Sequence, residues 1–210
     1  MQRQYLRLSA GGVVQNISSE IVYSTQLPKP TIKEQQKLAS FLEALDQKIN
    51  LLTKKKEALE TYKKGLMQKI FSQELRFKRE DGTDYQEWRK VKIGEVTICK
   101  DNKRIPLNQN ERNSKKGSFP YYGANGIVDY VDEYLFDEDL VLLAEDGGFF
   151  FEFRNKPIAQ LVKGKSWVNN HAHVLKAREG IIQTDYLFYS LVHRDIRRWI
   201  IGGSRVKLNK

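Results

Sequence analysis

The chain has 210 residues, 40% of them hydrophobic, and this length and composition suit a folded protein of one or two domains rather than a disordered one. Its 36 Lys and Arg against 26 Asp and Glu give a formal net charge of +10, which favours a polyanionic partner, nucleic acid first. No apolar run approaches the length of a membrane span and no signal peptide opens the chain, so we expect a cytoplasmic protein without a membrane partner. The single Cys99 excludes an internal disulfide and does not support a zinc finger.

A helix-start signal stands near the beginning of the chain, in the stretch LPKPTIKEQQKL. Pro28 and Pro30 favour extended backbone and end any earlier helix. Thr31 followed three residues later by Glu34 fits a capping box, in which each side chain bonds a free backbone N–H of the other residue. The sequence therefore predicts a long helix over 31–76, roughly 60 Å in length at about 1.5 Å per residue.

A heptad pattern runs along this predicted helix. Its apolar residues recur at the spacing of a coiled-coil seam: Leu38, Leu42, Leu45, Ile49, Leu52, Leu59, Leu66 and Ile70. Lys56 and Lys63 also enter the seam, and a parallel homodimer would set each against its own equivalent, whereas an antiparallel pairing sets them against leucines. We therefore favour an antiparallel helix pair. Packing of the helix on its own domain is the alternative, but the lysines leave little apolar width for a core face.

A second domain is predicted over 77–210. The turn at Asp81-Gly82 interrupts the helical periodicity, and segments rich in β-branched and aromatic residues follow. The predicted strand segments are VKIGEVTI, GIVDYVDEYLF, DLVLLAEDG, IAQLVKG and HAHVLKA. One late helix is expected at about 184–200. The sequence predicts an α+β fold, with a mostly β domain and one long coiled-coil helix.

Charge is unevenly distributed along this second domain. The stretches 100–116 and 193–210 are strongly basic, whereas 129–146 holds eight acids and no base. We expect the basic stretches to lie against phosphates and the acidic stretch to lie elsewhere. A merely solvated charged face is the alternative interpretation.

Several residues of the second domain are candidates for binding. The Gly-Gly pairs in EDGGFFF and IIGGSRVK allow positive φ and close approach of backbone N–H groups to a phosphate or base edge, although such pairs are also ordinary turns. Asn, Tyr and His side chains of the types that pair with or stack on bases stand in PYYGANG and WVNNHAH, and they are equally at home in turns. His171 and His173 fall on one face of a predicted strand, but no neighbouring carboxylate or Cys completes a metal-ligand set, so we expect no metal.

No catalytic motif is recognisable. The chain has no Walker loop, no G-x-G-x-x-G and no G-x-S-x-G, and its acidic stretch has no Lys at nuclease-like spacing. The sequence favours a binding protein without a cofactor over an enzyme.

Two groups of motifs together resemble one protein family. The segment LPKPTIKEQQKLASFLEALDQKI resembles the opening of the conserved helix in specificity (S) subunits of type I restriction-modification enzymes. The segments PYYGANGIVDYV, LVLLAEDGG, NNHAHVL and IIGGSRVKLN resemble parts of a target-recognition domain of the same family. The resemblance implies mixed α/β recognition domains joined by long conserved helices that pair antiparallel.

The resemblance also implies a function. Such subunits bind a bipartite double-stranded DNA sequence and hold the adenine methyltransferase (M) and restriction (R) subunits, while carrying no active site themselves. S-adenosylmethionine would then be bound by the partner subunit. The residues that we expect at the DNA are Tyr121, Tyr122, Asn125, Glu145, Gly147, Asn169, Asn170, His171, Gly202, Gly203, Ser204 and Arg205.

The chain departs from the family pattern in having one helix and one nearly complete recognition domain. We therefore expect residues 1–30 to be a terminal strand segment of a recognition domain, with the strand at 19–26, followed by the spacer helix over 31–76. A homodimer with an antiparallel helix pair would rebuild a two-domain reader of a palindromic bipartite target. The alternative is a truncated interaction protein that pairs or competes with a full-length S subunit and binds DNA poorly alone.

Overall fold

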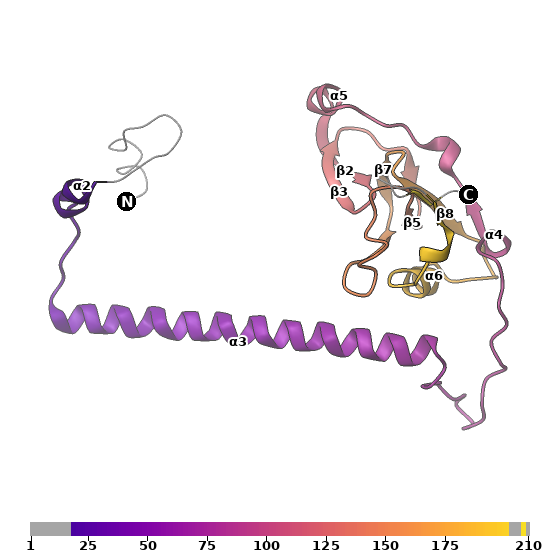
Figure 1. The fold of residues 1–210 in the computed structure, drawn as a ribbon, viewed down its shortest axis with the longest axis horizontal. Helices are drawn as coiled ribbons and strands as arrows, with labels where there is room; N and C mark the ends of the chain where they lie inside the picture. The colour runs from indigo at the N-terminus through magenta and orange to yellow at the C-terminus, as the bar shows by residue number, and fades with distance from the viewer. Residues whose placement is uncertain (1–17, 202–206, 209–210) are drawn as a thin grey trace. The chain divides into compact units, whose positions relative to one another are not determined.

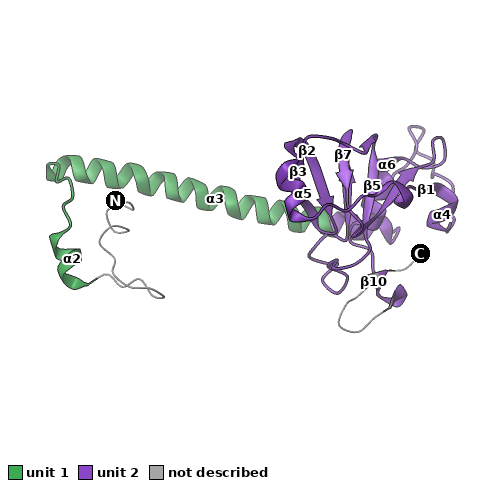
Figure 2. Cartoon of the chain, turned by 90° about the horizontal axis from the view of Figure 1, so that it is seen from above, with its two compact units in different colours: residues 1–64 green, residues 65–210 purple. Residues whose placement is uncertain are grey.

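The computed structural model describes residues 18–201 and 207–208. The chain divides into two compact units, residues 1–64 and 65–210 (Figure 2). The first unit holds the short helix α2, Ser19–Ser24, and most of the long helix α3, Ile32–Phe71, whose last turns belong to the second unit (Figure 1). None of the helices in the described ranges is long and apolar enough to cross a membrane.

The expectation of a strand at 19–26 is wrong, because Ser19–Ser24 is helical. Ser18 lies in extended backbone directly before the helix, and its hydroxyl accepts a hydrogen bond from the N–H of Ile21. Glu20 adds a favourable negative charge to the first turn. This capped turn satisfies locally the backbone groups that a strand would have to pair elsewhere.

Helix α3 begins where the capping signal predicts. Thr31 Oγ1 accepts from the N–H of Glu34 at 3.4 Å, so half of the predicted capping box is formed. The helix ends at Phe71 rather than at 76, because Gln73 takes a φ of 66° and the N–H of Leu75 bonds back to the carbonyl of Lys69. The helix itself buries no residue, which leaves its leucine seam open to a partner.

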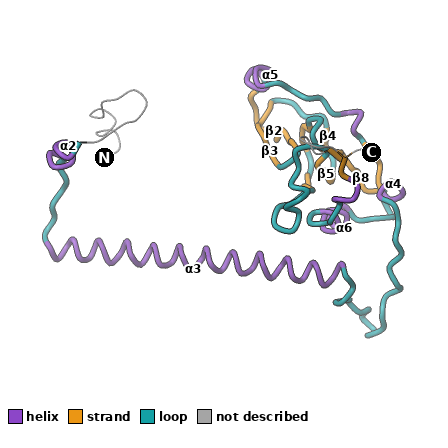
Figure 3. Tube along the Cα trace, in the orientation of Figure 1, coloured by secondary structure: helices purple, strands orange, loops and turns teal. Residues whose placement is uncertain are grey.

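The second unit is mostly β, as expected, and Figure 3 shows its strands and helices by colour. Its elements in chain order are α4 (Ile93–Val96), β1 (Thr97–Cys99), η1 (Asp101–Lys103), α5 (Gln109–Ser114), β2 (Lys116–Gly123), β3 (Gly126–Val131), β4 (Phe136–Asp137), β5 (Leu140–Ala144), β6 (Ala159–Val162), β7 (Lys165–Val168), β8 (Ala172–Ala177), α6 (Thr184–Leu191), η2 (Arg197–Trp199), β9 (Ile200–Ile201) and β10 (Lys207–Leu208). The α+β fold class is therefore confirmed.

Two four-stranded sheets form the body of this unit. The first has the order β1-β8-β5-β6 and is antiparallel throughout, and the second has the order β3-β2-β7-β4 with β2 and β7 parallel. Strand β5 is apolar at every position because both of its faces are covered. Val141 and Leu143 face a cluster that contains Leu187 of α6, whereas Leu142 faces a second cluster that contains Val168 of β7. The first sheet therefore lies between α6 and the second sheet.

Two predicted elements differ in the structure. The segment predicted as a strand at 91–98 begins with helix α4 and becomes strand only at Thr97. The late helix predicted at 184–200 stops at Leu191, and only the short turn η2 follows. The carbonyl of Val192 accepts the N–H of Ile158, and the N–H of Arg194 bonds to Leu191, so the backbone groups that would continue the helix are already used.

Candidate nucleic-acid interface

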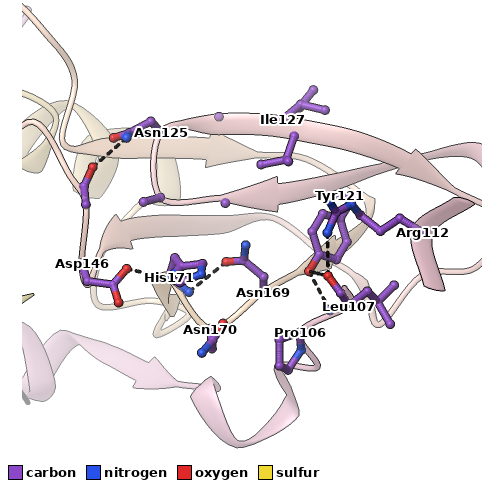
Figure 4. A pocket seen from close by; sticks show the side chains of 15 residues that line it. Pro106, Leu107, Arg112, Tyr121, Asn125, Ile127, Asp146, Asn169, Asn170 and His171 are labelled. Atoms are coloured by element: carbon purple, nitrogen blue, oxygen red, sulfur yellow. Dashed lines mark hydrogen bonds and ion pairs between the residues drawn. The ribbon is translucent and has the colours of Figure 1, made fainter. Parts of the chain in front are cut away.

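A pocket of about 600 Å³ lies within the second unit. Four stretches of chain form its wall: the segment at 106–112, the β2–β3 hairpin with its tip, the loop after β5, and the loop before β8 (Figure 4). Six of the residues that the sequence singles out line it, namely Tyr121, Asn125, Gly147, Asn169, Asn170 and His171. The fold thus brings together polar residues that lie far apart in the sequence.

Side-chain hydrogen bonds hold the hairpin tip and join it to the loop after β5. Gln160 Nε2 donates to the carbonyls of Gly123 and Ala124, both at 2.9 Å, and this holds the hairpin tip. Asn125 Nδ2 donates to the carbonyl of Gly147 at 2.8 Å, which joins the hairpin to the loop after β5. A Cβ on Gly123 would lie 2.8 Å from a methyl of Val128, so the close approach of the hairpin strands requires glycine there.

Three polar side chains reach the solvent at the mouth of the pocket. Asn125, Asn170 and His171 are exposed, and His171 Nδ1 lies 2.5 Å from Asp146 Oδ1. The backbone N–H of His171 bonds to Asn169 Oδ1 at 2.8 Å, so buried Asn169 shapes the loop that presents its neighbours. Exposed amide and carboxylate groups are among the side-chain groups that can pair with base edges in a DNA groove.

Tyr121 belongs to the core rather than to an open surface. Its side chain is 1% exposed and packs with Val131 and Trp167, and its hydroxyl accepts the N–H of Leu107 at 2.9 Å. Tyr122 is only partly buried and packs beside the cluster between the two sheets. To stack on a base, the Tyr121 side chain would have to leave the core. We therefore exclude Tyr121 from the residues expected to contact DNA.

Replacing Tyr121 with Phe tests this structural role. The change is expected to lower the free energy of unfolding by about 1 kcal/mol, because the N–H of Leu107 loses its partner. Urea denaturation of the two proteins measures the difference. DNA affinity is expected to stay unchanged, and a loss of affinity without a loss of stability would contradict the core assignment.

Glu145 is also buried, within a cluster of charged side chains. Arg104 Nη1 lies 2.5 Å from Glu145 Oε2, and the same guanidinium contacts Asp101 at 3.6 Å. His173 Nδ1 lies 2.7 Å from Asp101 Oδ2 and 3.7 Å from Glu145. We call these four side chains, Asp101, Arg104, Glu145 and His173, the buried ion cluster.

The buried ion cluster anchors the loops that form the pocket. Arg104 Nη1 donates to the carbonyls of Ala172 at 2.7 Å and Asn170 at 3.4 Å, so it holds the loop before β8. The backbone N–H of Leu208 bonds to the carbonyl of Glu145 at 2.7 Å, and His173 Nε2 lies 3.1 Å from the carbonyl of Leu208. The cluster therefore connects η1, both pocket loops and β10.

The expectation about the two histidines needs correction. His171 precedes β8 and lies in the open, whereas His173 is within the strand and buried. The fold does bring carboxylates to His173, and Asp101, Glu145 and His173 could in principle ligate a metal. The guanidinium of Arg104 already occupies these carboxylate oxygens, so the donor set fits an ion-pair network better than a metal centre.

The protonation of His173 follows from its partners. Burial alone would lower the pKa of His173, but hydrogen bonds to Asp101 and the Leu208 carbonyl, with the negative charges of both carboxylates, raise it above 6.5. Both ring nitrogens face oxygen acceptors, so both must donate, which requires the cationic imidazolium. Burial would raise the pKa of Asp101, yet the bonds from His173 and the N–H of Val174 hold that pKa well below its usual range.

The raised pKa of His173 predicts a pH dependence of stability. A folded-state pKa above the unfolded value gives a contribution that is complete below about pH 6.5 and is lost as the pH rises through the folded pKa. We expect the free energy of unfolding to fall with rising pH on the alkaline side of 6.5, as measured by urea titrations at several pH values. The variant His173→Gln should lose this slope, and an unchanged slope would refute the assignment.

The cations of the basic stretch 100–116 are largely paired within the domain. Their partners lie in the acidic stretch 129–146: Lys100–Glu138, Arg104–Glu145, Arg112–Asp129, Lys115–Glu133 and Lys116–Asp129. Arg112, which lines the pocket, also donates to the carbonyl of Leu107 at 2.6 Å. The prediction that this basic stretch lies against phosphates therefore loses its support.

Some expected residues cannot be compared. Gly202, Gly203, Ser204 and Arg205 lie outside the described residues. Sequence reasoning in turn missed Asp101 and Arg104, because their partners are distant in sequence. No local pattern around DNKR marks either residue as buried.

The fold and the pocket define a class: a small α+β binding domain attached to a long helix with an exposed apolar seam. A family model described as the type I restriction modification DNA specificity domain matches residues 1–61 and 85–210. The chain belongs to this family, and the resemblance stated from its motifs is confirmed.

Individual relatives agree with the family. A putative type I restriction enzyme specificity subunit of Haemophilus influenzae is 38% identical over 124 residues, which are 59% of this chain and 30% of that protein. The type I restriction enzyme MjaVIII specificity subunit of Methanocaldococcus jannaschii is 25% identical over 115 residues, 52% of this chain and 27% of that protein. The matches therefore span less than a third of the length of these curated relatives.

A solved structure shares the fold. The S subunit of a type I restriction-modification system from M. genitalium superposes with a TM-score of 0.61 at 19% identity. The match covers 94% of this chain and 52% of that one, so the chain corresponds to about half of the solved S subunit. At this identity the similarity establishes the fold alone.

Proposed function

We propose that this chain reads one part of a DNA target through the mouth of the 600 Å³ pocket, as a specificity component of a type I restriction-modification system. The observation that carries the proposal is the convergence of three polar loop segments on one open pocket in a domain of the DNA specificity family. Residues of these types at such a rim can pair with base edges and so select a sequence.

The pocket residues divide by exposure into contact and support. We propose Asn125, Asn170 and His171 as the side chains that face DNA, with Asp146 fixing the orientation of His171. Tyr122 and Gly147, which were also expected at the DNA, remain proposed contacts beside these three side chains. Buried Glu145 and Asn169 support the loops, and Gly202, Gly203, Ser204 and Arg205 remain proposed contacts that adjoin β10 in sequence.

The nonspecific part of DNA affinity is proposed to come from the net charge of the chain. Most cations of the basic stretch 100–116 form ion pairs with acidic side chains of the same domain. The formal net charge of +10 therefore acts mainly through long-range attraction to the phosphate backbone. Base selection is then left to the pocket rim. This separation predicts that salt weakens binding to every duplex, while pocket substitutions weaken binding to the target.

We propose that the chain acts without catalysing a reaction itself. In this proposal the M subunit binds S-adenosylmethionine and methylates adenine, and the R subunit cleaves DNA. Helix α3 serves as the spacer that sets the distance between the two halves of a bipartite target. Its 40 residues and exposed seam support this role, since such a seam needs a second helix.

Two sources could supply the second helix. One is a second copy of this chain, which gives a homodimer, and the other is a different specificity chain. The latter corresponds to the interaction-protein alternative.

Selection from a random duplex library tests the proposed function. The full chain is incubated with the library alone and together with the methyltransferase subunit, and bound duplexes are sequenced. We expect an enriched motif whose recovery rises when the methyltransferase subunit is present. Binding without any enriched motif in both experiments would reject sequence recognition by this chain.

A further inference from the structure

The side chain of Asn169 carries a buried amide whose two ends have different surroundings. This side chain lines the pocket, and the residue is only 7% exposed. Its Oδ1 accepts the backbone N–H of His171 at 2.8 Å, and because an N–H needs an acceptor, this bond fixes which end of the amide is the oxygen. The nitrogen Nδ2 is therefore the end that is turned away from His171 (Figure 4).

The amine end of Asn169 has no hydrogen-bond acceptor among the residues that the structure describes. The bonds of Asn169 there are the one that Oδ1 accepts and the one from its backbone N–H to the carbonyl of Tyr122. A buried donor without an acceptor costs free energy. The pocket is therefore suited to a ligand that brings an acceptor to Nδ2.

An apolar side chain stands beside this donor. A Cβ on Gly123 would lie 2.8 Å from Val128 Cγ2 and 3.4 Å from Asn169 Nδ2. The Val128 methyl and the Asn169 amine thus border the same small space, which glycine at 123 keeps open. Val128 lines the pocket and is 58% exposed, so a ligand in the pocket can contact its side chain.

The four bases present different groups to such a pair in the major groove of DNA. Thymine presents the O4 acceptor next to its 5-methyl group, whereas guanine presents acceptors without a methyl group. Cytosine presents its N4 amine, which would face the amine of Asn169. Asparagine recognises adenine with both ends of its amide, but Oδ1 of Asn169 is already used. Thymine is the base whose edge matches both the donor and the apolar side chain.

We propose that the pocket selects a thymine, with Asn169 Nδ2 donating to O4 and Val128 contacting the 5-methyl group. This inference rests on the proposed function and adds to it the identity of one base. Asn169 then has two roles, since Oδ1 shapes the loop before β8 and Nδ2 selects the base. The exposed side chains of Asn125, Asn170 and His171 contact neighbouring positions of the target.

Deoxyuridine tests the methyl contact, because it differs from thymidine only in lacking the 5-methyl group. Each thymine of the selected duplex is replaced in turn, and fluorescence anisotropy measures affinity for the full chain with the methyltransferase subunit. We expect at least one position at which the replacement weakens binding about fourfold, the contribution of one buried methyl group. Val128→Ala should abolish this difference. The control Val91→Ala shortens another exposed valine, which does not line the pocket, and should keep it.

The variant Asn169→Asp tests the donor. It exchanges the free amine for an oxygen, while the other oxygen can still accept the N–H of His171. Selection from the random library with this variant should replace thymine at that position by a base that presents an amine, cytosine or adenine. The control Asn110→Asp adds the same charge to an exposed residue of α5 and should still select thymine.

The outcomes separate this inference from the proposed function. A selected motif in which no thymine is sensitive to deoxyuridine overturns the thymine contact, while sequence recognition by the chain stands. Continued selection of thymine by Asn169→Asp has the same consequence. The absence of any enriched motif with the wild-type chain rejects the proposed function and this inference with it. Circular dichroism shows whether each variant is folded, and if Asn169→Asp is not, the deoxyuridine comparison decides alone.

Discussion

Replacing Arg104 with Met is expected to lower the free energy of unfolding by about 3 kcal/mol, because it leaves buried carboxylates without their guanidinium partner. The side chains of Arg104, Asp101 and Glu145 are 13%, 3% and 12% exposed, so water cannot replace the lost interaction. The carbonyls of Asn170 and Ala172 also lose a donor. Urea denaturation monitored by tryptophan fluorescence measures the change.

A matched substitution shows whether the destabilisation depends on the burial of the ion pair or only on the loss of an arginine. Arg197→Met removes the same side chain from an ion pair with Asp195 at 2.6 Å, but both groups are about half exposed. Exposed pairs contribute little, so this variant should unfold close to wild type. Equal destabilisation by both substitutions would show that the buried ion cluster has no special role. Arg104→Met should in addition weaken target binding, since it releases the pocket loops.

Replacing Asn170 and His171 together with Ala is expected to reduce affinity for the selected DNA target by about 100-fold, through the loss of two base contacts. Both side chains are exposed, and the bonds that shape their loop use the backbone of these residues and the side chain of Asn169. The fold is therefore expected to survive the change. Fluorescence anisotropy with the target and with a random duplex measures both affinities.

Comparing affinity for the target duplex with affinity for a random duplex shows whether Asn170 and His171 contact bases or phosphates. Affinity for the random duplex should stay unchanged, because the phosphate contacts are not altered. The control Asn110→Ala removes an exposed amide from helix α5 and should leave both affinities as in wild type. An equal loss on target and random duplex would instead make Asn170 and His171 phosphate contacts without a role in sequence selection.

Local patterns predicted the elements whose determinants are local. Thr31 and the heptad leucines predicted helix α3, and the apolar run at 140–144 predicted strand β5. Strand β2 was missed because it contains Pro120 and glycines at 117 and 123, which argue against a strand. The structure accommodates them with irregular register against β3. Gly117 in particular lies where a Cβ would meet the backbone of Asp132 at 2.3 Å.

The candidate site shows the same division between local and distant determinants. Residue types suitable for base contact could be recognised in PYYGANG and NNHAH, but the sequence does not show which of them face solvent. Tyr121 and Glu145 are buried by partners 14 and 41 residues away, Leu107 and Arg104. The pairing of the basic stretch 100–116 with the acidic stretch 129–146 likewise arises only when the sheets bring them together. Neither feature has a local sequence signal.

The most direct measurement of the proposed function is the map of methylated adenines in cells that carry this chain with its methyltransferase partner. Single-molecule sequencing should reveal a bipartite motif that is absent from cells without the chain. The variant Asn125→Ala, Asn170→Ala, His171→Ala should lose the motif or relax one of its halves while the protein remains folded and abundant. An unchanged motif in the variant would contradict sequence recognition through this pocket.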